Sequence, residues 1–74
     1  MPTTIFESDT YDLAKVSEFQ LRITHKPSGK TVDFNDFAAQ GIINTIYQQS
    51  NLGHEITETL DRISNTILEK GGFK

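Results

Sequence analysis

The sequence predicts a small α+β domain in which a β-hairpin packs on two C-terminal α-helices. Apolar and polar residues alternate within residues 17–34, which is the period of β-strands. Beyond residue 35, apolar residues recur at steps of three and four, which is the period of amphipathic helices. A chain of 74 residues is the size of one domain, so we assign residues 1–74 to a single domain.

The composition is acidic and poor in hydrophobic residues. Hydrophobic residues make up 35% of the chain, whereas about 45–50% is usual when glycine is also counted. No cysteine is present, so neither a disulfide nor a thiolate metal ligand can stabilise the fold. A small core without such support gains stability by association, either with a second copy or with a larger protein.

Residues 1–16 have weak patterning. Thr3 to Phe6 favour an extended conformation and are a candidate third strand, because threonine, isoleucine and phenylalanine suit pleated surfaces. No helical or strand period continues after them. We therefore expect residues 1–16 to form an N-terminal arm or a short strand that docks on the rest of the domain.

Residues 17–34 predict the β-hairpin. Pro27 presets the backbone for the first central position of a turn, and Gly29 tolerates a positive φ shortly after it. Such a two-stranded hairpin needs helices against its apolar face to be stable. The apolar face of the predicted hairpin consists of Phe19, Leu21, Ile23, Val32 and Phe34.

Residues 35–70 predict the helical region, for which two arrangements are open. Asn51-Leu52-Gly53 resembles a helix C-terminus with Gly53 as its left-handed cap, which would give a helical hairpin. An unbroken register through Gly53 would instead give one helix of about 34 residues, roughly 50 Å long. We favour two helices, because most helices of globular proteins are shorter than about 20 residues.

A narrow apolar stripe runs along this helical region and suggests helix–helix packing, either within the chain or between two copies. Apart from Leu68, its flanks in the second half are polar or charged. The stripe contains Ile42, Ile46, Gln49, Gly53, Ile56, Leu60, Ile63 and Ile67. From its second half we predict a homodimer of the coiled-coil type, with Ile56, Leu60, Ile63 and Ile67 as the self-association residues.

One local cluster of basic residues stands out, formed by Arg22, His25, Lys26 and Lys30 around the hairpin turn. The whole chain has 7 basic and 10 acidic residues and a net charge of −3, which argues against general nucleic-acid binding. We interpret the four residues as a candidate contact for an acidic surface of a partner protein. The alternative is that they form an ordinary solvated turn.

No pattern in the sequence indicates an enzyme, a cofactor site or a metal site. His25 and His54 fall in different predicted elements, and neither has further ligands at the spacing that zinc requires. Three aromatic residues, Phe6, Tyr11 and Phe73, lie outside the apolar faces. They either close the edges of the core or anchor an interface.

The N-terminus has no basic and apolar segments of a signal peptide, and no apolar run approaches the length of a membrane span. We therefore expect a cytoplasmic protein without membrane contact. The predicted function is non-catalytic protein binding: a small, self-associating regulator, of the size and composition common among virus-encoded inhibitors, that occupies a surface of a larger partner. The alternatives are a dimeric, nucleic-acid-associated regulator that uses the basic turn, and a structural subunit of a larger assembly.

Overall fold

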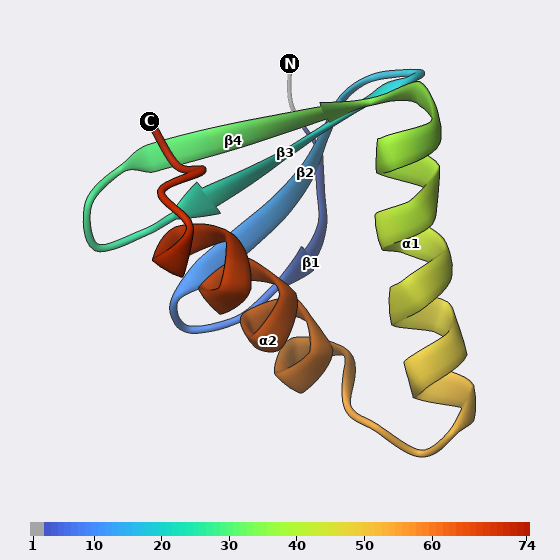
Figure 1. The fold of residues 1–74 in the computed structure, drawn as a ribbon. Helices are drawn as coiled ribbons and strands as arrows, with labels where there is room; N and C mark the ends of the chain where they lie inside the picture. The colour runs from blue at the N-terminus through green and yellow to red at the C-terminus, as the bar shows by residue number, and fades with distance from the viewer. Residues whose placement is uncertain (1–2) are drawn as a thin grey trace.

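The computed structural model describes residues 3–74 and shows four strands followed by two helices (Figure 1). The elements are β1 (Thr3–Glu7), β2 (Tyr11–Ser17), β3 (Gln20–His25), β4 (Lys30–Asn35), α1 (Asp36–Asn51) and α2 (Ile56–Glu69). The strands form one antiparallel sheet in the order β1-β2-β3-β4. Both helices lie on the same face of this sheet, and the other face is left uncovered (Figure 1). The predicted α+β class and the packing of the hairpin on two helices are confirmed.

The N-terminal region differs from the expected arm, because it supplies two strands of the sheet. The expected third strand is present as β1, while β2 lies between β1 and β3. In β2 the covered face carries Tyr11 and Leu13 and then Lys15, which pairs in register with Leu21. A lysine at this position interrupts the apolar alternation, which is why the strand was not visible in the sequence. Residues 1 and 2 of the predicted arm lie outside the described residues.

The core forms between the covered face of the sheet, the two helices and the C-terminal segment. Phe73 packs its ring against Tyr11, with 5.9 Å between the ring centroids. Next to it, Lys74 and Thr31 exchange two backbone hydrogen bonds, of 2.9 and 3.1 Å, at the edge of β4. The main buried apolar cluster contains Tyr11, Leu13, Leu21, Ile23, Ala39, Ile46, Leu60 and Phe73. Tyr11 and Phe73 are therefore core residues, while Phe6 is half-buried against the same cluster.

The helical region is divided at Gly53, as the sequence favoured. Gly53 has a φ of +93°, in the left-handed region that glycine adopts without steric cost. Its amide donates a hydrogen bond to the carbonyl of Ser50, and the next amide, that of His54, donates to the carbonyl of Gln49. These bonds end α1 with a reversal of the chain direction. The continuous helix of about 34 residues is excluded.

We expect Gly53→Ala to lower the free energy of unfolding by about 1 kcal/mol, because the Cβ of alanine makes a positive φ sterically unfavourable. A Cβ at this position would meet no atom within 4 Å, so the backbone conformation alone causes the loss. Urea denaturation of both variants measures the change. Gly41→Ala is the control: Gly41 lies inside α1 with open space around it, and alanine there should stabilise. A gain in stability for Gly53→Ala would contradict the assigned turn.

Candidate protein-interaction surface

The structure distributes the four predicted basic residues over different surroundings. Arg22 lies on the uncovered face of the sheet, where its Nε donates to the carboxylate of Asp33 at 2.7 Å. Lys26 forms an ion pair with Glu7 and also donates to the backbone carbonyl of Ser8. Two of the three permanent cations are therefore already paired with acidic side chains.

The other two residues of the basic cluster lie on the covered side of the sheet. The imidazole of His25 packs against two aromatic rings, with ring centroids 5.4 Å from Tyr11 and 6.2 Å from Phe73, and its Nδ1 is 2.7 Å from the Ser28 hydroxyl. Lys30 pairs in register with His25 and is exposed. The fold thus does not bring the four residues together as one free cationic patch.

The Arg22–Asp33 pair adds a pH-dependent contribution to stability. The hydrogen bond from Arg22, together with its charge, holds the pKa of Asp33 below its usual value. A carboxylate with a lowered pKa in the folded state stabilises that state above its unfolded pKa. The contribution is lost as the pH falls through the folded pKa. Because both side chains are substantially exposed, water screens the interaction and the effect is small.

The four predicted self-association residues pack inside the single chain. Leu60 is fully buried, with 0% of its surface exposed, and it belongs to the main core cluster. Ile56, Ile63 and Ile67 are half-buried against the same cluster. The apolar stripe of α2 therefore covers the sheet, which is the intrachain alternative that its spacing allowed. Self-association remains a prediction, and Leu60 has no exposed surface to contribute to it.

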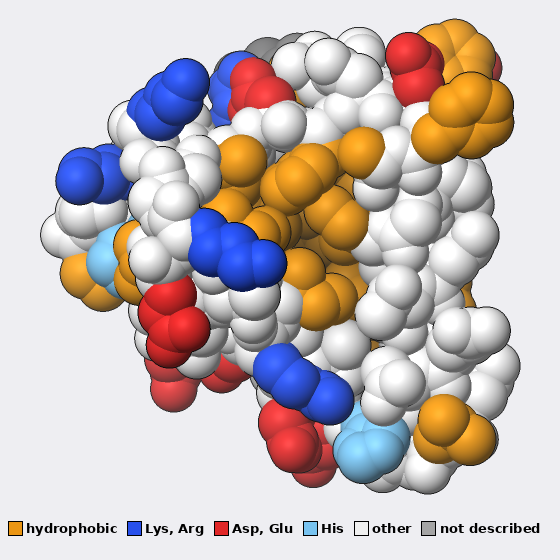
Figure 2. Space-filling view, viewed as in Figure 1, with side chains coloured by type: hydrophobic (Ala, Val, Ile, Leu, Met, Phe, Trp, Pro, Cys, Tyr) orange, Lys and Arg blue, Asp and Glu red, His pale blue; other side chains and the backbone are white. Residues whose placement is uncertain are grey.

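Two exposed aromatic side chains lie at the junction where α1 begins, and we call Phe19 and Phe37 the aromatic corner. Phe37 is 93% exposed and Phe19 is 65% exposed. The two are held close in the backbone, because the Asp36 amide donates to the Phe19 carbonyl at 2.8 Å. Asp36 itself has a φ of +49°, which is uncommon for a residue other than glycine. Figure 2 shows hydrophobic side chains projecting from the molecule where α1 starts.

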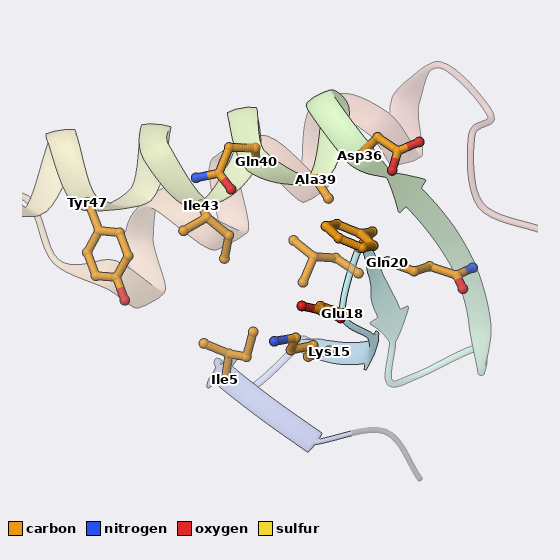
Figure 3. A pocket seen from close by; sticks show the side chains of 11 residues that line it. Ile5, Lys15, Glu18, Gln20, Asp36, Ala39, Gln40, Ile43 and Tyr47 are labelled. Atoms are coloured by element: carbon orange, nitrogen blue, oxygen red, sulfur yellow. The ribbon is translucent and has the colours of Figure 1, made fainter.

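A groove borders the aromatic corner and runs between α1 and the β1–β2 side of the sheet. We call it the α1 groove; its volume is about 270 Å³ (Figure 3). Tyr47 is held in its wall by an edge-to-face contact with Phe6, with ring centroids 6.0 Å apart. The groove is lined by Ile5, Lys15, Glu18, Phe19, Gln20, Leu21, Asp36, Ala39, Gln40, Ile43 and Tyr47.

Sequence reasoning missed the aromatic corner. It assigned Phe19 to the apolar face of the hairpin, but Phe19 lies in the turn before β3 and outside the sheet. It also did not single out Phe37, which lies in the first turn of α1. The buried residues of α1 are Ala39 and Ile46, and at about 100° per residue Phe37 lies well away from their direction. A helical wheel indicates the exposure of Phe37 only once the buried residues of α1 are known, so the sequence alone did not show it.

The described residues contain no group of three or more His, Asp or Glu side chains placed to bind a metal ion. None of the helices in residues 3–74 is both long and apolar enough to cross a bilayer. Comparison with protein-family models, curated proteins and solved structures found no significant match.

Proposed function

We propose that this protein is a non-catalytic interaction protein that regulates a larger partner protein by occupying part of its surface. The contact is made by the aromatic corner. The observation that supports the proposal best is the 93% exposure of Phe37 next to the exposed Phe19. Exposed neighbouring aromatic residues on a small domain are typical of binding surfaces.

The chemistry of the corner indicates what the partner must supply. A phenyl ring has no polar group, so its burial is favoured only in an apolar pocket. Phe37 lies in the first turn of a regular helix and Phe19 in a tight turn between two paired strands. Both are therefore attached to rigid elements, which limits the entropy that binding would cost. The partner should offer an apolar cleft that receives both rings.

The proposal is tested by comparing the proteins that three purified variants capture from cells that naturally contain the chain. Wild type, Phe37→Ser and Leu52→Ser are immobilised in equal amounts, and the captured proteins are quantified by mass spectrometry. Leu52 is the matched control, because it is 73% exposed but lies at the far end of α1. Serine at either position should leave the fold intact, since neither side chain belongs to the core.

We expect wild type and Leu52→Ser to capture the same partner and Phe37→Ser to capture at least about tenfold less of it, because anchor residues contribute about 2 kcal/mol or more. The affinity of the captured protein for each variant is then measured by calorimetry. Equal affinities for wild type and Phe37→Ser would refute the aromatic corner as the contact. Loss of binding in both serine variants would point to a nonspecific apolar effect and would equally refute it.

A further inference from the structure

We infer that the α1 groove is a second interface, at which two copies of this chain associate about a twofold axis. This goes beyond the proposed binding of a larger partner; Phe37 lies outside the groove, while Phe19 lies where the groove meets the aromatic corner. The inference concerns which surface takes a second copy. The α1 groove, and not the apolar stripe of α2, is the surface that we assign to self-association, because Leu60 in that stripe is fully buried within its own chain.

The first support is the apolar surface that the single chain leaves uncovered. Six large apolar side chains are exposed among residues 3–74, and four of them line the groove or lie at the aromatic corner beside it. Within the groove, Tyr47 is 53% exposed and Ile5 lies opposite it (Figure 3). The floor reaches the buried side chains of Leu21 and Ala39. Covering the groove would therefore extend the main core.

The second support is the charge in the groove. Lys15 projects from the helix-covered face of the sheet, in register with Leu21, at a position where an apolar residue would continue the core. Glu18 lines the same side of the groove (Figure 3). Neither residue forms an ion pair within the described part of the chain. One patch thus contains an unpaired cation and an unpaired anion.

These two features match the requirement of a twofold interface, in which the same patch must complement itself. A twofold axis near the groove brings Lys15 of each copy to Glu18 of the other, so the ion pair forms twice. The apolar side chains Ile5 and Tyr47 line the same groove and are therefore covered by the same contact. A second copy supplies both complementary charges and the apolar surface without any further assumption about an unknown protein.

The sheet edge beside the groove also permits this approach. β1 is an edge strand, and its first residues Thr3, Thr4 and Ile5 are uncharged, so they do not repel a second copy. The opposite edge is less suitable. At that edge, which is β4, the backbone of Lys74 already forms hydrogen bonds with Thr31. A twofold axis centred on Asp33 would also place the Asp33 side chains of the two copies opposite each other, where they would repel.

The inference is tested by charge exchange, with the oligomeric state measured by sedimentation equilibrium over a micromolar range. Wild type should be a dimer. Lys15→Glu creates two repulsive contacts with Glu18, and Glu18→Lys creates two with Lys15. Each variant alone should therefore weaken the dimer by at least about tenfold. Lys30→Glu is the control, because it makes the same charge change at an exposed residue outside the groove.

The decisive experiment mixes the two single variants. An equimolar mixture of Lys15→Glu and Glu18→Lys places opposite charges at both contacts, so the mixture should form a heterodimer. The double variant with both exchanges should again form a homodimer. Circular dichroism confirms that each variant is folded. A monomeric wild type would overturn the inference, and so would a dimer that both single exchanges leave unchanged.

The two surfaces share Phe19, but the failure of each proposal can be distinguished, because Phe37 lies outside the groove and Lys15 outside the aromatic corner. Phe37→Ser should remain dimeric while losing the larger partner, whereas Lys15→Glu should become monomeric while its aromatic corner stays intact. A wild-type monomer that still binds a partner through Phe37 would refute only the groove interface. A dimer that binds no partner through Phe37 would refute only the proposed function.

Discussion

Leu60→Glu is expected to unfold the protein. The Leu60 side chain is 0% exposed and contacts the sheet from the middle of α2. Burying a carboxylate there without a partner costs several kcal/mol, which is a large part of the roughly 5–15 kcal/mol that holds a typical domain folded. Circular dichroism should show loss of secondary structure, and thermal denaturation should show no cooperative transition.

Leu68→Glu is the matched control for this prediction. Leu68 is in the same helix and is 37% exposed, so a carboxylate there can reach water. We expect this variant to keep its fold and to lose only about 1 kcal/mol in the free energy of unfolding. A folded Leu60→Glu variant that had merely become monomeric would contradict the intrachain packing. It would support instead an interface built from the α2 stripe.

Phe73→Ala is expected to lower the free energy of unfolding by about 3–5 kcal/mol, the usual cost of removing a buried phenylalanine. Its ring is buried against Tyr11 and His25. The backbone of the following residue, Lys74, forms two hydrogen bonds with Thr31. Loss of the ring should therefore also weaken these bonds between the C-terminal segment and β4. Urea denaturation of the two variants, monitored by circular dichroism, measures the loss.

Phe37→Ala serves as the comparison, because it removes the same ring from an exposed position. Its stability should change by less than about 0.5 kcal/mol. If Phe73→Ala were as stable as Phe37→Ala, the C-terminal segment would not be part of the core. The difference in the free energy of unfolding between the two variants thus distinguishes the core residue Phe73 from the surface residue Phe37.

The elements with complete local patterns could be predicted from the sequence. In β3 and β4 the alternation continues to both ends of the strands, and the turn between them contains Pro27 and Gly29. The end of α1 could be predicted because Asn51-Leu52-Gly53 resembles a helix C-terminus, and the glycine has the positive φ that this ending needs. In these cases local residues and tertiary packing favour the same structure.

The rest depends on contacts between distant segments. β2 escaped prediction because Lys15 occupies a position on its covered face where the helices leave a groove. The ion pairs of the basic residues could not be predicted either, because their partners are distant in the sequence. Arg22 pairs with Asp33 on the neighbouring strand β4, and Lys26 pairs with Glu7 at the end of β1. Nothing local to Phe19 or Phe37 shows that the fold leaves their rings outside the core. The sequence therefore led to the proposal of a binding protein but not to the surface that we propose for it.

Hydrogen exchange in the presence of the captured partner tests the central claim most directly. The account predicts that partner binding slows exchange of backbone amides at residues 17–21 and 35–41, which surround the aromatic corner. The α1–α2 turn at residues 51–54 should exchange at the same rate with and without the partner. Slowed exchange confined to residues 25–30, around the basic turn, with no change at the aromatic corner would contradict the account.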